Sequence, residues 1–277
     1  MATVGVIGLG AMGNPISRHL LSKNHQVTVY DVKEELARAL ESKGARVARD
    51  PAEVGEKSEL NLVIVIDDAQ VKEVCLGPKG IVEKAKEGAV IAIMSTVSPE
   101  TCREVAAGAR KRSIEVIDAP MVRGALAAEE GNLLLMVGGD SRVIERCRPI
   151  LGAFATDVCR LGDVGAGQVG KMVNNLLLWA CFMASYEGLS LGRSLGVDPN
   201  VLRQALMISS ADNWALREWE RNCKQVKWWH QKDLSGVLSV SEAAGVPVPL
   251  SALVKELIKP LGPREGKALF LEEGQPW

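Results

Sequence analysis

Residues 3–13, TVGVIGLGAMG, decide the fold of this chain. The apolar run Thr3–Gly8 predicts a strand buried on both faces, and Pro15–Ser22 has the pattern of a helix. The glycines between them form G-x-G-x-x-G: the first allows a tight turn, the second lets the backbone approach a pyrophosphate, and the third lets the helix pack against the strand. The N–H groups at the helix start suit the phosphates of a dinucleotide. The predicted cofactor contacts here are Gly8, Leu9, Gly10, Ala11, Met12 and Gly13.

A second predicted strand, residues 26–31 (QVTVYD), ends in an acid. A carboxylate about twenty residues after the glycines can accept hydrogen bonds from the adenosine ribose of NAD. Asp31 would repel the 2′-phosphate of NADP, and Val32 offers no guanidinium to bind one. NAD is therefore the expected cofactor, with NADP as the alternative because Lys33 is close by. The competing interpretation of the whole segment is a tight strand-to-helix turn that binds nothing.

Strand and helix patterns then continue to alternate, which predicts a doubly wound parallel sheet, a Rossmann fold. Ligands in such sheets lie at the carboxyl ends of the strands, and this places Ile66, Asp67 and Thr96 beside the cofactor. Asp67 and Ser98 have an alternative role as helix N-caps. The predicted strands are residues 45–48, 60–66, 89–94 and 114–117, and the helices between them include residues 34–42 and 99–111.

The loop Asp118–Gly124 follows the last of these strands, and residues 133–139 predict another strand. Arg123 is the residue of this loop best suited to hold an anionic substrate group, because its guanidinium gives directional, bidentate hydrogen bonds. The alternative is a surface arginine paired with Glu129 or Glu130.

The glycine-rich segment Gly162–Gly170 reads as a flexible turn and as the domain boundary. We expect a Rossmann domain over residues 1–162 and an all-helical domain over residues 163–277, which begins with a long interdomain helix. Lys171 and Asn175 stand four residues apart, so they share one face of that helix.

Composition excludes several classes of function. The chain has 277 residues, of which 47% are hydrophobic, and a formal charge of -1, so no global field attracts nucleic acid or an anionic membrane. Its six cysteines form no C-x-x-C pair, so neither a disulfide framework nor a metal site is expected. An apolar strand by Thr3 leaves no space for a signal peptide, and we expect a cytoplasmic protein.

With four motifs in this order, the chain resembles the β-hydroxyacid dehydrogenase family, of the 3-hydroxyisobutyrate dehydrogenase type. The motifs are residues 8–13, 118–124, 165–175 and 232–234. The resemblance implies that Lys171 is the catalytic acid and base and that Asn175 holds the substrate. It also implies that Thr96 contacts the nicotinamide-side ribose and that Lys232 approaches the cofactor from the second domain.

Two features depart from that family. Val122, Arg123 and Gly124 replace its usual Ser-Gly-Gly, which removes a substrate-binding hydroxyl and adds a cation. An arginine here is similar to the sulfolactaldehyde reductase branch and implies a carboxylate, sulfonate or phosphate on the substrate. Trp214, Trp219, Trp228 and Trp229 precede Lys232. We expect them to pack in the core, although one ring could line the substrate pocket.

The expected function is hydride transfer between NAD and a small anionic 3-hydroxy acid or its semialdehyde. An imine reductase is the alternative enzyme, but such enzymes generally lack a lysine at this position. A non-catalytic NAD-binding module is the alternative of a different class. The apolar segment 176–183 has more apolar surface than one sheet needs, so we expect a homodimer or homotetramer. The alternative is a helix that is buried within its own domain.

Overall fold

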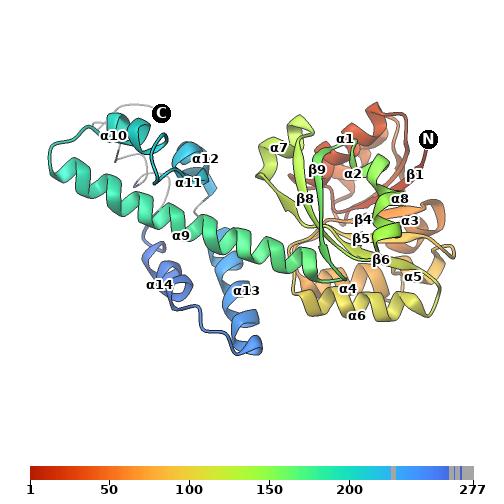
Figure 1. Ribbon diagram of the computed structural model, residues 1–277. Helices are drawn as coiled ribbons and strands as arrows, with labels where there is room; N and C mark the ends of the chain where they lie inside the picture. Colours follow the sequence, from red (N-terminus) through yellow and green to blue (C-terminus); the bar gives the residue numbers. More distant parts are fainter. Residues whose placement is uncertain (226–228, 262–264, 266–268, 270–277) are drawn as a thin grey trace. The chain divides into compact units, whose positions relative to one another are not determined.

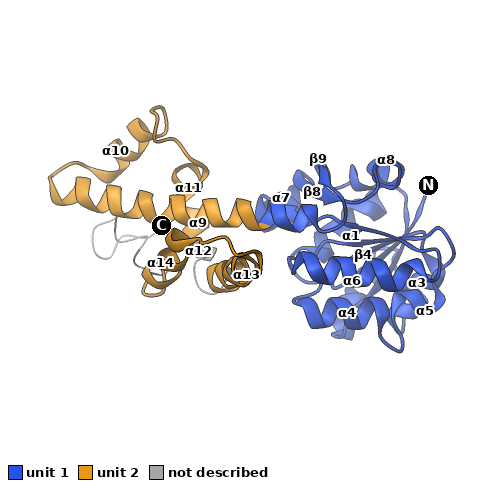
Figure 2. Ribbon diagram, turned by 60° about the horizontal axis from the view of Figure 1, so that its bottom comes forward, with its two compact units in different colours: residues 1–171 blue, residues 172–277 orange. Residues whose placement is uncertain are grey.

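The computed structural model describes residues 1–225, 229–261, 265 and 269. The chain divides into two compact units, residues 1–171 and 172–277, coloured blue and orange in Figure 2. The division falls inside the long helix α9 (Ala166–Ser194), whereas the sequence predicted it before that helix, after residue 162.

The first unit contains a nine-stranded sheet in the order β3-β2-β1-β4-β5-β6-β8-β7, with β9 paired to β8. Strands β1 to β6 pair in parallel, which confirms the predicted doubly wound sheet. Strand β8 runs antiparallel to β6 and β7 and parallel to β9. The strands are β1 (Thr3–Ile7), β2 (Gln26–Tyr30), β3 (Arg46–Val47), β4 (Leu60–Val63), β5 (Val90–Ile93), β6 (Glu115–Asp118), β7 (Met121–Val122), β8 (Leu133–Gly138) and β9 (Ala155–Gly162).

Helices cover both faces of this sheet, which is why every residue of β4 and β5 is buried. Alternate strand residues enter two separate cores, one completed by α1, α2, α7 and α8 and the other by α3 to α6. Figure 1 shows the two layers on opposite sides of the strands. The helices are α1 (Gly13–Ser22), α2 (Glu34–Glu41), α3 (Pro51–Lys57), α4 (Asp68–Leu76), α5 (Ile81–Lys84), α6 (Pro99–Arg110), α7 (Gly124–Glu130) and α8 (Ser141–Leu151).

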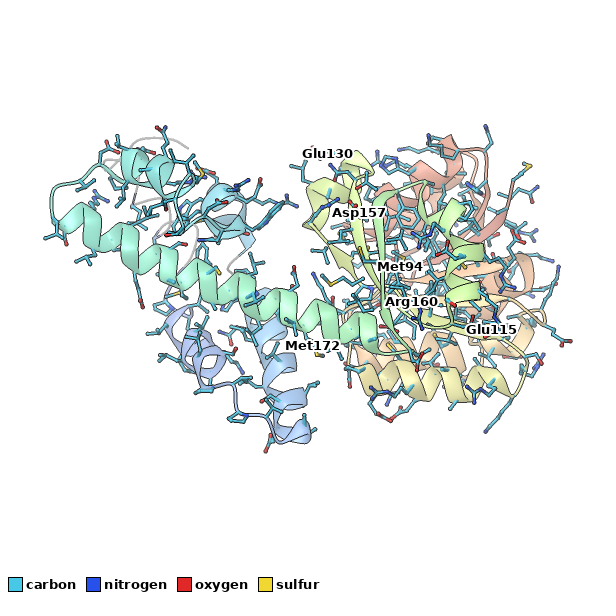
Figure 3. All side chains as sticks on the ribbon, in the orientation of Figure 1. Met94, Glu115, Glu130, Asp157, Arg160 and Met172 are labelled. Carbon is cyan, nitrogen blue, oxygen red and sulfur yellow. The ribbon has the colours of Figure 1, made fainter. Side chains whose placement is uncertain are left out.

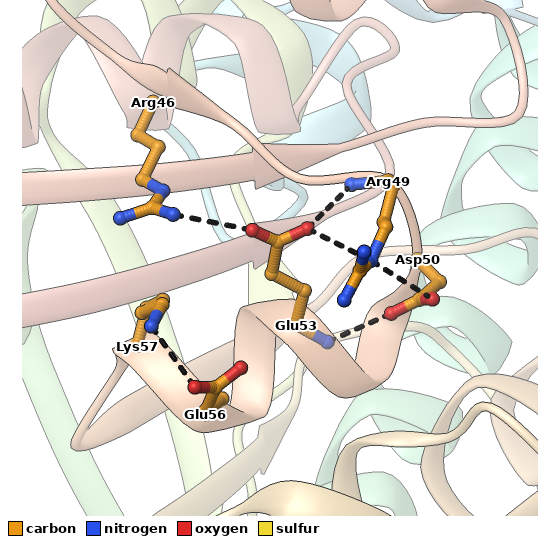
Figure 4. A network of polar contacts seen from close by, with 6 residues as sticks. All are labelled: Arg46, Arg49, Asp50, Glu53, Glu56 and Lys57. Atoms are coloured by element: carbon orange, nitrogen blue, oxygen red, sulfur yellow. Dashed lines mark hydrogen bonds and ion pairs between the residues drawn. The ribbon is translucent and has the colours of Figure 1, made fainter.

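Helix α3 is held against the short edge strand β3 by polar contacts (Figure 4). The side chain of Asp50 caps the helix by accepting a hydrogen bond from the N–H of Glu53 at 2.8 Å, and Pro51 occupies the first turn. The carboxylate of Glu53 in turn accepts from Arg46 on β3 and from the backbone N–H of Arg49, each at 3.2 Å. The two-residue strand β3 is thereby held by side-chain contacts as well as by its backbone pairing with β2.

The sequence did not predict strand β9. Most of its side chains are partly or fully exposed, because it pairs with β8 alone, and its residues lack an alternating apolar pattern. The predicted glycine-rich turn is shorter than expected: it covers residues 163–165, because α9 begins at Ala166 and its first two turns contain glycines 167 and 170.

Every regular element among the described residues of the second unit is a helix, as predicted. Its core is built around Trp179, Phe182 and Trp219, and the rings of Phe182 and Trp219 stack with centroids 5.0 Å apart. Among the described residues, no helix combines the length and the apolar character needed to cross a membrane. Besides α9, its helices are α10 (Pro199–Leu206), α11 (Trp214–Arg217), α12 (Trp219–Gln225), α13 (Trp229–Ala244) and α14 (Pro249–Leu257).

Candidate functional site

The glycine turn after β1 has the geometry that a dinucleotide requires. Gly8 has φ +91°, and a Cβ there would lie 2.1 Å from the carbonyl oxygen of Ile64. A Cβ on Gly13 would lie 1.9 Å from the oxygen of Gly8, so both positions demand glycine. A Cβ on Gly10, by contrast, would meet no protein atom within 4 Å. The open space beside Gly10 suits a phosphate approaching the backbone, and α1 directs its first N–H groups from the same turn.

Asp31, at the end of β2, is fixed beside this turn. One carboxylate oxygen accepts from the N–H of Leu9 at 2.7 Å and the other from the N–H of Lys33 at 2.8 Å. A carboxylate has about four lone-pair sites, so each oxygen can still accept a ribose hydroxyl. The neighbouring Val32 is 88% exposed and makes no competing polar contact.

The loops after β4 and β5 contain three further predicted contacts. Ile66 is 58% exposed, and its N–H donates to the side chain of Gln70. Asp67 caps α4 by accepting from the N–H of Gln70 at 2.8 Å, the N-cap role that the sequence also allowed. Thr96 is partly buried, between Ser95 and Val97.

Gln168, which no sequence motif indicated, joins the loop of Thr96 to α9. Its side chain is fully buried. Its amide nitrogen donates to the carbonyl oxygen of Ser95 at 2.8 Å, and its amide oxygen accepts from the N–H of Val97 at 3.1 Å. The only signal in the sequence was a single polar residue among small residues at the start of a helix.

Asp118 anchors the same helix from the end of β6. Its carboxylate is fully buried and accepts from the N–H of Gly165 at 2.6 Å and from the N–H of Gln168 at 2.8 Å. Burial raises the pKa of Asp118, while hydrogen bonds from backbone N–H groups, those of Gly165 and Gln168 first among them, oppose that shift. The carboxylate thus satisfies helix N–H groups that would otherwise be unpaired in the interior.

Close packing explains the glycines at the start of α9. A Cβ on Gly167 would lie 2.3 Å from the oxygen of Met136, and one on Gly170 would lie 2.2 Å from Leu161. These glycines let α9 contact β8 and β9 directly, so the segment is a packing surface and not a flexible turn.

Lys171 and Asn175 stand one turn apart on α9, as predicted. Lys171 is partly buried. Asn175 is 4% exposed, and its side-chain oxygen accepts from the amide of Asn174 at 3.0 Å. The N-terminal turns of α9 that carry Lys171 belong to the first unit, and Asn175 belongs to the second.

Arg123 is paired, but with neither of the predicted partners. Its guanidinium contacts Asp157 at 2.8 Å and donates to the hydroxyl of Thr156 and the carbonyl of Asn132. Figure 3 labels Asp157, on β9, and Glu130, on α7. Arg123 also has φ +78°, a left-handed conformation that favours glycine. It lies between the buried Val122 and Gly124, which has φ +72°.

The remaining candidates lie in the second unit. Lys232 is on α13, next to Asp233, whose carboxylate accepts from the indole N–H of Trp179 at 3.1 Å. Trp219 is fully buried, as expected for core packing, whereas Trp214 is 48% exposed. Trp228 and the side chain of Trp229 lie outside the described residues.

The link between Asp118 and α9 can be tested by Asp118→Asn. The variant keeps one acceptor oxygen but turns the other position into an N–H₂ donor that faces a helix N–H. We expect it to lower the free energy of unfolding by about 2–3 kcal/mol, measured by urea denaturation at neutral pH. Asp140→Asn is the matched control, because Asp140 caps α8 at the surface and asparagine caps nearly as well. Equal midpoints for both variants would contradict the assigned role of Asp118.

Comparison with known proteins agrees with this geometry. Residues 3–165 match the family model described as the NAD binding domain of 6-phosphogluconate dehydrogenase, which confirms the predicted dinucleotide-binding domain. Residues 165–269 match the model described as NAD-binding of NADP-dependent 3-hydroxyisobutyrate dehydrogenase.

Among relatives, 2-(hydroxymethyl)glutarate dehydrogenase of Eubacterium barkeri is 32% identical over 92% of this chain and 88% of its own length. A probable mitochondrial 3-hydroxyisobutyrate dehydrogenase of Dictyostelium discoideum is 36% identical over 76% of this chain, and the match spans 66% of that protein's length. The solved structure of the Mycobacterium tuberculosis 3-hydroxyisobutyrate dehydrogenase with L-serine shares the fold, with a TM-score of 0.88 at 24% identity over 98% of this chain and 100% of its own. The chain therefore belongs to the β-hydroxyacid dehydrogenase family, of the 3-hydroxyisobutyrate dehydrogenase type.

Proposed function

We propose that this protein interconverts a small anionic 3-hydroxy acid, or a related hydroxyalkyl anion, and its carbonyl form with NAD as cofactor. One observation carries the proposal. The first turns of α9, which carry Lys171, are bonded to the loop of Thr96 through Gln168 and to the end of β6 through Asp118. A lysine is thereby fixed at the edge of the sheet where the parallel strands end and where such folds bind nucleotides.

The residues of the first unit fit NAD. The phosphates would lie against the open side of Gly10 and the first N–H groups of α1, and the carboxylate of Asp31 would accept from the adenosine ribose. That carboxylate favours NAD over NADP, whose 2′-phosphate it would repel. Ile66, Thr96 and Lys232 complete the proposed cofactor contacts.

When bound, the cofactor would supply a hydride as NADH for reduction or accept one as NAD⁺ in oxidation. Lys171 donates a proton to the carbonyl oxygen during reduction and removes the hydroxyl proton during oxidation. A positively charged nicotinamide ring nearby would disfavour the charged form of the Lys171 amine, so that a neutral amine would be available as the base for oxidation. Asn175, one helical turn after Lys171 on α9, would hold the substrate and orient that lysine.

We propose that Val122, Arg123 and Gly124 bind the anionic group of the substrate. The ion pair with Asp157 and the bonds to Asn132 and Thr156 use three of the five guanidinium N–H groups of Arg123. The remaining donors can bind a carboxylate or sulfonate. Asp157 then competes with the substrate anion for the guanidinium of Arg123.

Replacement of Lys171 tests the proton transfer. Lys171→Ala should lower kcat by about 100-fold or more on any hydroxy acid that the parent oxidises, because no group is left to take the proton. Lys171→Arg is the matched control, since it keeps the positive charge but cannot give up a proton, and it should be equally inactive. Turnover of Lys171→Ala within a few fold of the parent would refute the role. NAD binding with no turnover of any hydroxy acid by the parent would instead favour a non-catalytic module.

The anion contact predicts opposite effects for two variants. Arg123→Ala should raise the KM of a carboxylate or sulfonate substrate about tenfold with kcat little changed, because a charge-assisted contact is lost. Asp157→Asn should lower that KM, because it removes the competing carboxylate. Arg142→Ala, whose side chain is 91% exposed, is the control for loss of a positive charge. An unchanged KM in Arg123→Ala would contradict a role in substrate binding and would leave Arg123 with a structural role in its loop.

We also propose that the protein assembles as a homodimer or homotetramer. Val169, Val173 and Leu177 follow one another at four-residue intervals on α9 and are 44%, 50% and 55% exposed. A stripe of this kind is suited to packing against another copy. Light scattering should give two or four times the mass of the 29.7 kDa chain, and a monomeric mass at micromolar concentration would contradict the proposal.

A further inference from the structure

We infer that Gln168 is a positioning residue that fixes the backbone on both sides of Thr96 relative to the helix that carries Lys171. The inference rests on the proposed function, because it takes Thr96 as a cofactor contact and Lys171 as the group that moves the proton. All the residues that carry it belong to the first unit.

The amide of Gln168 is matched to both of its partners at once. Its nitrogen donates to the carbonyl of Ser95, and its oxygen accepts from the N–H of Val97, so it binds the two peptide groups that flank Thr96. The side chain is fully buried, and Ser95 and Val97 are 4% and 3% exposed. An apolar side chain of the same size would leave a buried carbonyl and a buried N–H without partners.

Gln168 is itself held in place. Its backbone N–H donates to the buried carboxylate of Asp118 at 2.8 Å, so its position on the helix is fixed from β6. Lys171 follows three residues later, at a spacing that brings side chains to the same side of a helix. One short stretch of α9 thus sets the position of the proton-transfer group and the shape of the loop expected to contact the nicotinamide ribose.

Gln168→Glu makes this role measurable, because the two side chains have the same size. A protonated carboxyl can donate to Ser95 and accept from Val97, as the amide does. An ionised carboxylate instead directs an oxygen at the oxygen of Ser95, and burial together with that repulsion raises the pKa of the introduced carboxyl. The variant should therefore bind NAD like the parent at low pH. As the pH rises through this pKa, it should lose the hydrogen bond to the carbonyl of Ser95 that helps to fix the loop.

The experiment is calorimetric titration of the full-length protein with NAD between pH 5 and 8, with circular dichroism to confirm folding at each pH. In Gln168→Glu the Kd for NAD should be within about threefold of the parent at pH 5 and at least about tenfold weaker at pH 8. Gln26→Glu is the control, because Gln26 is exposed at the amino end of β2, and its Kd should follow the parent throughout. A Kd ratio for Gln168→Glu that does not change with pH in folded protein would overturn the inference.

A second variant tests the positioning role of Gln168 if Gln168→Glu fails to fold at pH 8. Gln168→Met removes both hydrogen bonds without adding charge, so it should weaken NAD binding at every pH with no trend. A parent-like Kd in Gln168→Met would then overturn the inference. Failure of the proposed function looks different, because the parent itself would then not bind NAD or not oxidise any hydroxy acid.

Discussion

The buried carboxylate of Asp118 at the N-terminus of α9 is the interaction on which the site depends. An ionised carboxylate is costly to bury unless hydrogen bonds replace its hydration. Here they come from the backbone N–H of Gly165, just before the 29-residue helix α9, and from that of Gln168 in its first turn. The helix dipole favours negative charge at the same end. Because Asp118 ends a sheet strand, its bonds place the first turns of α9, and with them Lys171, at the carboxyl edge of the sheet.

That attachment requires backbones to approach closely, which is why glycines surround it. A Cβ on Gly138 would lie 2.4 Å from one oxygen of Asp118, and a Cβ on Gly167 would lie 2.7 Å from the other. Any side chain at either position would push the carboxylate away from the helix. The glycines therefore allow close packing around a buried charge. Gln168 in turn links α9 to the loop after β5 by two hydrogen bonds.

Arg123 combines a charged side chain with a backbone conformation that favours glycine. The family resemblance implies a glycine at this position, and Arg123 adopts the left-handed backbone that glycine prefers. Such a conformation costs free energy, which the contacts of its guanidinium with Asp157, Thr156 and Asn132 offset. The strained backbone conformation thus occurs at Arg123, the same residue that is expected to change which substrate the protein binds.

The sequence alone determined the parallel sheet, the glycine turn, the acid at the end of β2 and the common helix face of Lys171 and Asn175. These features depend on local spacing, which a linear pattern contains. Only the tertiary structure decided that β9 joins the sheet, that Arg123 pairs with Asp157, and that Asp118 and Gln168 anchor α9. The residues of these contacts are separated by 22 to 73 positions, so no local pattern specifies them. They exist only because packing brings distant groups within hydrogen-bonding distance.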